Sequence, residues 1–503
     1  MMKFKYVFLF VFFLVFASCT FFHKDKKPAK PNIIVFLADD LGYGDLGCYG
    51  NPIIKTPHLD QLASEGVLFT DCHSGGTVCS PSRYALLTGR HPYRGGFYYL
   101  QGSWGTYLHS EEITIAELLK TAGYETCYVG KWHLSRLENK KGKPHEPTPG
   151  DQGFNYWFAT THNAFDGPKN TKEFIRNGEP VGQVNGWYCD VIVKEAIYWL
   201  NKIRDKNKPF FLMVASHEPH APIDPPEKYS NMYDNGEVDK LEKTIKYGRV
   251  KRPVRDISKY KKEYYGTVSQ LDNAFGVLMK SIDSVGLRKN TFVFFTSDNG
   301  PEYPVNFQES QGKWKDPLRD KCFGTPGILR GMKRFPYEGG HRVPAIARWP
   351  GVIPAGIESS ALLNGTDILP TFCALAGVKP PYDRVLDGKD AFNAFLGKPV
   401  YRKKPVLWLF PLHSDCILMT PHLAMREGKY TLIGWFPQKN DSVNLVDWMK
   451  SSVPDRFELY NIKEDPGQYK NIIKENPIVV KNLIPLMNKQ WINIRDEGPW
   501  YNK

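Results

Sequence analysis

Residues 75–90, GGTVCSPSRYALLTGR, place a cysteine between a glycine-rich turn and a helix. Pro81 has the fixed φ angle that suits the first turn of a helix, so the helix is expected to begin close to Cys79. The free N–H groups and the dipole of a helix N-terminus favour negative charge there. Arg83 lies one helical turn after Cys79 and can face the same space. The stretch therefore predicts a nucleophile beside a guanidinium, in a site for an oxyanion substrate.

The same stretch resembles the motif of the sulfatase family, Cys-x-Pro-Ser-Arg followed by Leu-Thr-Gly-Arg. In that family a formylglycine-generating maturation enzyme oxidises the cysteine to formylglycine (3-oxoalanine), an aldehyde whose hydrate attacks sulfur. A lone cysteine is more often a buried structural thiol, but a match in register at every fixed position favours the catalytic interpretation. The matching residues are Cys79, Pro81, Ser82, Arg83, Leu87, Thr88, Gly89 and Arg90.

Strongly apolar runs alternate with helical patterns along the chain. Residues 31–38, 125–129, 209–215 and 291–297 are typical of buried strands, and residues 113–122, 191–203 and 264–282 of amphipathic helices. This alternation predicts an α/β fold with a large, mostly parallel sheet sandwiched by helices, in which ligands bind beyond the carboxyl ends of the strands. The resemblance implies the alkaline phosphatase-like version of that fold.

Acidic and amide side chains follow two of the predicted strands. Asp39 and Asp40 end the first run, and Asp298 and Asn299 follow the run at 291–297. Adjacent carboxylates repel each other unless a cation lies between them, although an acidic turn is the simpler interpretation of Asp39-Asp40 alone. The resemblance implies that these four residues, together with residue 79, bind Ca²⁺, a metal that prefers hard oxygen ligands.

Cationic side chains occur in three further motifs. Lys131 and His133 follow the run at 125–129 and, with a spacing of two, face the same side of an extended segment. The resemblance implies that both lie in the active site, that His220 protonates the leaving sugar oxygen, and that His133 takes the proton whose loss expels sulfate. Lys333 takes the place of the family's sulfate-binding lysine; His217 is a second choice for the catalytic histidine.

The N-terminus is typical of a secreted bacterial protein. Lys3 and Lys5 precede an apolar run that is too short to span a bilayer and ends at Ser18-Cys19. Residues 16–19 resemble a lipobox with a looser first residue, so Cys19 is a candidate for lipid anchoring and plain secretion is the alternative. We expect export across the inner membrane to a periplasmic or outer-membrane-anchored location. The predicted domains are a signal peptide at 1–18, a tether at 19–30, a catalytic domain at 31–395 and an α+β C-terminal subdomain at 396–503.

Composition and charge indicate which kinds of molecule this chain can bind. The 503 residues carry a formal charge of +13, which suits an anionic partner. Motifs for stacking bases or reading a nucleic-acid groove are missing, so a sulfated saccharide is the expected substrate and nucleic acid is not. The nine cysteines show no spacing typical of a zinc site, and any disulfide pairing stays open. Residues 140–185 are expected to form a long loop region, and the basic stretch at 239–262 a solvated helix or loop.

Two other functions compete with a sulfatase that resembles bacterial arylsulfatases or N-acetylgalactosamine-6-sulfatases. One is hydrolysis of phosphate or phosphonate esters by a related enzyme of the same superfamily; the predicted oxygen ligands argue against the zinc that such enzymes commonly use. The other is a non-catalytic glycan-binding lipoprotein, if Cys79 remains a thiol. Candidate contacts to the sugar, each with a structural role as the alternative, are His162, Trp187, Glu218, Tyr303 and Arg319.

Overall fold

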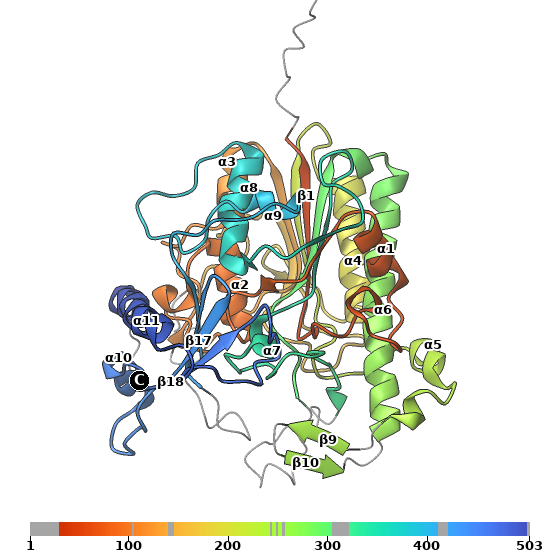
Figure 1. Ribbon diagram of the computed structural model, residues 1–503. Coiled ribbons are helices and arrows are strands. Elements are labelled where there is room, and N and C mark those ends of the chain that lie inside the picture. Colours follow the sequence, from red (N-terminus) through yellow and green to blue (C-terminus); the bar gives the residue numbers. More distant parts are fainter. Residues whose placement is uncertain are drawn as a thin grey trace, which may run out of the picture.

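A ten-stranded sheet forms the centre of the molecule, and a four-stranded sheet lies toward the C-terminus (Figure 1). The computed structural model describes residues 30–499 apart from seven internal segments. The predicted α/β fold with one large sheet is confirmed. The segments outside the description are 103–104, 139–144, 242–243, 248–249, 254–256, 304–320 and 411–420.

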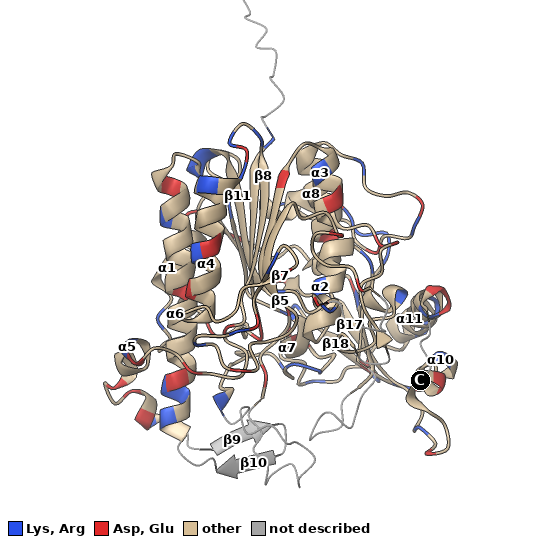
Figure 2. Ribbon diagram, turned by 180° about the vertical axis from the view of Figure 1, so that it is seen from behind, with Lys and Arg blue, Asp and Glu red and all other residues tan. Residues whose placement is uncertain are grey.

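Five neighbouring strands at the centre of the large sheet run parallel, in the order β11-β1-β8-β4-β5. Such strands are covered on both faces, which explains why β1, β8 and β11 are apolar runs without charge. Figure 2 shows the ribbons of β8 and β11 in tan, with the charged residues on surrounding helices and loops. The bounds are β1 Asn32–Ala38, β4 Glu125–Lys131, β5 Tyr156–Thr160, β8 Phe210–Ala215 and β11 Thr291–Ser297.

Short strands extend the sheet at both edges. β12 is antiparallel to β11, β2 is antiparallel to β12, and β13 closes that edge parallel to β2. On the other edge β6 adds antiparallel to β5 and β7 antiparallel to β6, while β3 and β14 form a separate parallel pair. The bounds are β2 Val67–Phe69, β3 Cys72–His73, β6 Ile175–Arg176, β7 Glu179–Pro180, β12 Ala345–Arg348, β13 Ile357–Ser359 and β14 Leu363–Asn364.

Helices cover both faces of the sheet (Figure 1). Ile34 and Phe36 of β1 belong to a cluster with α1, α4 and α6, whereas Ile33, Val35 and Leu37 point to the opposite face and pack with α2, α3, α8 and α9. The strand's period of two thus builds two hydrophobic cores. The bounds are α1 Pro57–Ser64, α2 Cys79–Thr88, α3 Ile115–Thr121, α4 Tyr188–Tyr198, α6 Ile257–Ser284, α8 Ile368–Ala376 and α9 Phe392–Phe395.

The C-terminal sheet has four antiparallel strands in the order β15-β16-β17-β18. Met487 and Trp491 of α11 pack against Met425 and Leu432 of that sheet, so the last helix holds it through apolar contact. An α+β arrangement was expected here. The bounds are β15 Val406–Leu409, β16 Leu423–Glu427, β17 Tyr430–Trp435, β18 Arg456–Asn461, α10 Leu445–Ser451 and α11 Pro477–Glu497; elsewhere lie α5 Glu227–Ser230 and α7 Glu338–His341.

Two sequence expectations are wrong. Residues 140–185 contain β5, a fully buried strand of the parallel core, and not only loop. Its five residues, YWFAT, have the aromatic character of a strand, but they are too few to stand out among the prolines and glycines around them. The basic stretch at 239–262 contains the hairpin β9 (Thr244–Tyr247) and β10 (Val250–Pro253), not a helix or loop alone.

The structure bears only partly on the predictions made for the cysteines and for the N-terminus. Within the described residues, six cysteines are free thiols: Cys48, Cys72, Cys79, Cys127, Cys189 and Cys373. No helix in residues 30–499, as far as they are described, is long and apolar enough to cross a membrane. The predicted signal peptide and most of the tether, with Cys19, lie outside the described residues, as does Cys416.

The packing of α6 on the sheet is testable at Phe275. Its buried ring lies 5.5 Å from that of Phe36 and 5.7 Å from that of Phe295, centroid to centroid. We expect Phe275→Ala to lower the free energy of unfolding by about 3–5 kcal/mol, because it leaves a cavity between helix and sheet. The measurement is urea unfolding followed by circular dichroism. Val277→Ala, on the exposed side of the same helix, is the control; equal losses in the two variants would contradict the packing.

Candidate active site

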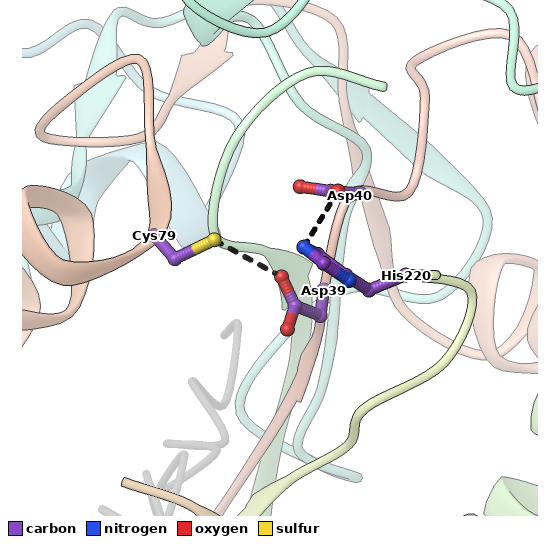
Figure 3. Close-up of side chains that lie close together, drawn as sticks. All are labelled: Asp39, Asp40, Cys79 and His220. Carbon is purple, nitrogen blue, oxygen red and sulfur yellow. Dashed lines mark hydrogen bonds and ion pairs between the residues drawn. The ribbon is translucent and has the colours of Figure 1, made fainter. Parts of the chain in front are cut away.

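The carboxyl ends of four parallel strands bring the predicted site residues to one edge of the sheet. Asp39 and Asp40 follow β1, Lys131 ends β4, and Asp298 follows β11. His220 lies in the turn after β8. Cys79 is the first residue of α2, as expected from Pro81, and the whole of that helix is buried. Figure 3 shows the Cys79 thiol and the His220 ring directed at the adjacent carboxylates of Asp39 and Asp40.

Asp39 contacts the cysteine and two of the cations. Its Oδ1 lies 3.3 Å from Cys79 Sγ, and its Oδ2 accepts a short hydrogen bond from Lys131 Nζ and lies 3.6 Å from Arg83 Nη2. All four side chains are almost completely buried. Residue 79 thus shares the Asp39 carboxylate with two fixed positive charges.

Asp40 has its own set of partners. Lys333 Nζ lies 2.7 Å from Oδ1, Asn299 Nδ2 donates to Oδ1 at 2.7 Å, and His220 Nε2 lies 3.4 Å from Oδ2. Asp40 adopts a positive φ of 62°, which turns its side chain away from the direction of the strand. This backbone conformation lets the two successive aspartates contact different partners.

Arg83 joins the helix to two strands. Its Nε donates to Asp298 Oδ2 at 3.0 Å, its Nη2 lies 2.8 Å from the same oxygen as an ion pair, and its Nη1 donates to the carbonyl of Lys131 at 2.7 Å. The guanidinium therefore fixes α2 to the ends of β4 and β11 at once. A lysine could not supply this planar set of donors.

His133 lies two residues after the end of β4 in a left-handed conformation, with φ 57°. Its backbone carbonyl accepts a hydrogen bond from Ser80 Oγ at 2.7 Å, which ties it to the start of α2. Gly130 allows β4 to approach this closely, because a Cβ there would lie 1.9 Å from the carbonyl oxygen of Ala215 on β8. Burial and the charges of Lys131 and His162 lower the pKa of His133 well below its usual range.

Like charges are crowded at the centre of the site. Burial and the charge of Asp39 raise the pKa of Asp298 to about 7, and burial also raises the pKa of Asp40. Burial raises the pKa of Asp39 too, but Lys131, His220 and Arg83 outweigh it and hold that pKa well below its usual range. Three buried carboxylates thus compete for the available positive charge, and a further cation would relieve their repulsion.

The donor atoms fit a hard divalent cation. Asn299 Oδ1 is buried and accepts no hydrogen bond, although the Nδ2 of the same amide donates to Asp40. Ligand atoms of Asp39, Asp40, Cys79 and His220 lie within 4.8 Å of one another. An orphaned amide oxygen beside three carboxylates is an incomplete set of oxygen ligands, of the kind that Ca²⁺ binds.

The Cys79 thiol is in a poor state for nucleophilic attack. Burial and the adjacent charge of Asp39 raise its pKa well above the usual range, so the thiolate is not populated near neutral pH. Reactive cysteines ordinarily have a lowered pKa. The surroundings of residue 79 therefore suit an oxygen nucleophile better than a thiolate.

Sequence reasoning did not single out Asn163 or Glu302. Asn163 follows β5, and its Nδ2 lies 3.0 Å from Nε2 of His220. Glu302 is buried, is bridged by Arg334 Nη1 at 2.6 and 2.8 Å, and lies 3.8 Å from Lys333 Nζ. The aromatic run before Asn163 and the position of Glu302 just beyond Asp298-Asn299 are the sequence signals for these two residues, but neither residue belongs to a recognised motif.

The five candidate sugar contacts lie in different surroundings, and not all of them are beside the site. The ring of His162 packs 5.4 Å from that of His133, beside the site. Glu218 is structural, since its Oε1 accepts from the backbone N of Cys189 at 3.0 Å. Trp187 donates to the carbonyl of Asp224 at 2.9 Å, and Tyr303 is buried near Arg334. Arg319 lies outside the described residues.

Comparison with known proteins bears on the chemistry of this site. Residues 31–378 match the family model described as Sulfatase, which covers more than half of the chain. The chain belongs to the sulfatase family. It is a sulfuric ester hydrolase with an alkaline phosphatase-like α/β fold. Residues 331–497 also match a model described as N-sulphoglucosamine sulphohydrolase, C-terminal.

Individual sulfatases are similar over much of the chain. N-acetylgalactosamine-6-sulfatase of Canis lupus familiaris is 35% identical over 74% of this chain and 67% of its own length. N-acetylgalactosamine-6-O-sulfatase of Bacteroides thetaiotaomicron is 30% identical over 92% of this chain and 93% of its own. The crystal structure of Ps i-CgsB in complex with k-i-k-neocarrahexaose has a TM-score of 0.72 at 26% identity and covers 94% of this chain and 95% of its own.

The contribution of Arg83 is testable by stability. We expect Arg83→Met to lower the free energy of unfolding by about 3–5 kcal/mol in the presence of a chelator, because it leaves buried Asp298 without its guanidinium. The control is Arg176→Met, which removes a similar fork from Glu195 at a site where the arginine side chain is 41% exposed; its cost is expected to stay below about 1 kcal/mol. Urea unfolding measures both, and a loss for Arg83→Met no larger than the control's would refute the inferred role.

Proposed function

We propose that this sulfatase hydrolyses sulfate monoesters on saccharides, using a formylglycine made from Cys79 and a bound Ca²⁺. The observation that carries the proposal is the buried Cys79 on the Asp39 carboxylate, which also pairs with the cations Arg83 and Lys131. A site with so much fixed positive charge around a potential nucleophile is matched to an anionic ester.

The saccharide part of the proposal is supported by similar proteins. The bacterial relative is named for removal of a 6-O-sulfate from N-acetylgalactosamine, and a structural neighbour was crystallised with neocarrahexaose. The excess positive charge of this chain agrees with a polyanionic substrate.

Oxidation of Cys79 would replace a thiol that the raised pKa keeps protonated and therefore weakly nucleophilic. A hydrated aldehyde presents oxygen to the sulfur of the ester, and it removes the one sulfur donor from the ligand cluster of Asp39, Asp40, Cys79 and His220. The family resemblance assigns this oxidation to a formylglycine-generating enzyme. That enzyme would have to act on the chain before folding is complete, because Cys79 is only 1% exposed.

Asp39, Asp40, Asp298 and Asn299 would hold the Ca²⁺, with residue 79 as a further ligand. When bound, Ca²⁺ would offset the charge of the sulfate group and polarise one of its oxygens. The orphaned Asn299 Oδ1 and the crowded carboxylates support this assignment.

The cationic side chains would orient the sulfate group. Arg83, Lys131 and Lys333 are buried and held in place by Asp298, Asp39 and Asp40, so little reorganisation is needed when a substrate arrives. Their charges would also stabilise the negative charge that builds up on the sulfuryl oxygens as the ester bond breaks.

Two histidines would move protons. Burial and the charge of Lys333 lower the pKa of His220 well below its usual range, so this ring is neutral before an anion binds. A bound sulfate would favour its protonated form, which could then donate to the leaving sugar oxygen. His133, also neutral, would accept the proton whose loss expels sulfate and restores the aldehyde.

The location of the enzyme in the cell is part of the proposal. The apolar run after Lys3 and Lys5, and the lipobox-like residues 16–19, support export and a periplasmic or outer-membrane-anchored location with Cys19 as the lipidated residue. Sulfated polysaccharides would meet the enzyme there.

The proposed reaction is tested with paired esters. Protein co-produced with a formylglycine-generating enzyme is expected to hydrolyse 4-nitrophenyl sulfate faster than 4-nitrophenyl phosphate and to release inorganic sulfate from sulfated monosaccharides. The mass of the peptide containing residue 79 should fall as oxygen replaces sulfur.

Cys79→Ala is expected to lower kcat/KM for the sulfate ester at least about 10³-fold, because the nucleophile is removed. Cys373→Ala, which changes another buried cysteine in α8, serves as the control and should keep nearly full activity. Faster hydrolysis of the phosphate ester, or equal activity of the two variants, would overturn the proposal.

Calcium binding is tested by thermal stability. Addition of Ca²⁺ to chelator-treated protein is expected to stabilise the fold by about 3–4 kcal/mol at 100 to 1,000 times the Kd, and therefore to raise Tm. Asn299→Leu should lose most of this shift, since it removes the orphaned amide oxygen. Asn461→Leu is the matched control, because Asn461 Oδ1 is also buried without a hydrogen bond but lies in β18. An undiminished shift in Asn299→Leu would exclude the site.

A further inference from the structure

A groove of about 680 Å³ lies between the edge of the large sheet and the C-terminal sheet. One wall is formed by residues 360–362, directly after the edge strand β13, and another by the loop at 397–404. The turn between β16 and β17 and residue Lys463 after β18 complete it. A volume of this order is typical of ligand-binding clefts, which range over about 300–1,000 Å³.

Positive charge predominates in the groove, because six lysine and arginine side chains and three acidic side chains line it. The two arginines are already used within the fold: Arg402 pairs with Asp367, and Arg426 Nη2 lies 3.1 Å from Asp71 Oδ2. They form structural ion pairs on the inner side of the groove and leave the lysines as its outward-facing charges.

The four lysines, Lys398, Lys404, Lys429 and Lys463, are all exposed. They come from three separate segments of the chain and line one groove. Among the described residues, no carboxylate lies within ion-pair distance of any of the four ammonium groups. Lysines that converge on a concave surface without acidic partners repel one another unless an anion lies between them.

We propose that this groove is a second binding site, for a segment of a sulfated saccharide chain. The inference rests on the proposed function for the class of saccharide, and goes beyond it by placing a second contact outside the catalytic cluster. None of the ten candidate site residues lines the groove. A polymer held there would raise the local concentration of its other sulfate groups near residue 79.

Two features favour a sulfated saccharide over a nucleic acid. Tyr401 is 83% exposed at the groove and offers an amphipathic ring to the faces of sugars. Four flexible ammonium groups suit sulfates at irregular spacing along a chain, whereas planar guanidinium groups are the usual partners of phosphates and bases. A single exposed aromatic ring does not form the series of stacking platforms typical of single-stranded nucleic-acid sites.

The experiment measures binding without catalysis. Protein with the Cys79→Ala change is titrated with dextran sulfate and, separately, with neutral dextran of the same length by isothermal titration calorimetry. The test variant adds Lys398→Ala, Lys404→Ala, Lys429→Ala and Lys463→Ala. The control variant instead removes four lysines that are equally exposed on other surfaces: Lys202, Lys206, Lys289 and Lys379.

Three results are expected. Dextran sulfate binds and neutral dextran does not; the groove variant raises Kd about tenfold or more; and the control variant changes it less than about twofold. In addition, Tyr401→Ala should weaken binding more than Tyr382→Ala, a change at a fully exposed tyrosine elsewhere. Hydrolysis of 4-nitrophenyl sulfate by groove variants that retain Cys79 should be unchanged, which separates this site from the catalytic one.

The proposal is overturned if the groove and control variants weaken binding equally, since general charge would then explain it. It is also overturned if single-stranded DNA binds as tightly as dextran sulfate through the same four lysines. Because binding is measured in protein that lacks Cys79, these outcomes are independent of whether sulfate esters are hydrolysed.

Discussion

The structure depends on burying three carboxylates and three cationic side chains together at the carboxyl edge of parallel strands. Each of these charges would be costly to bury alone, by several kcal/mol even after relaxation. Lys131 beside Asp39, Lys333 beside Asp40 and Arg83 beside Asp298 reduce that cost pairwise. The pairs bring together elements that are up to 293 residues apart in sequence.

The sheet makes this arrangement possible. Strands β11, β1, β8 and β4 are parallel neighbours, so their ends deliver Asp298, Asp39, the His220 turn and Lys131 side by side. Apolar cores on both faces hold the strands in place, and the charged groups are confined to the one edge where the strands end. Burial and the charge of Asp39 keep the pKa of Asp298 near 7 in spite of Arg83 and Lys131, so repulsion between the carboxylates remains. We infer that a divalent cation completes the site.

Much of this could be predicted from the sequence because the site residues follow strands. Apolar runs mark β1, β4, β8 and β11, and a polar residue directly after such a run must lie at the sheet edge. Cys79 and Arg83 were predictable from the position of Pro81 and the helical spacing. All ten predicted site residues lie in or directly beside the observed cluster, but Lys333 follows no strand and was predicted only from the resemblance to the sulfatase family, as was the choice of His220.

Other parts of the fold and the site could not be predicted from the sequence, and the reasons are physical. β5 is only five residues long, so its aromatic run has no clear period, and Asn163 beyond it belongs to no motif. Glu302 acquires its position through Arg334, a tertiary contact that local pattern does not encode. The lysines of the groove are ordinary surface residues in sequence, and only the packing of the C-terminal sheet beside β13 brings them together.

A high-resolution crystal structure of matured protein grown with Ca²⁺ tests the central claim most directly. The account predicts a single strong density peak surrounded by oxygen atoms of Asp39, Asp40, Asp298 and Asn299, with residue 79 as an oxidised, sulfur-free side chain beside it. A peak bound elsewhere, or an intact Cys79 thiol paired to Asp39 with no cation between the carboxylates, would contradict it.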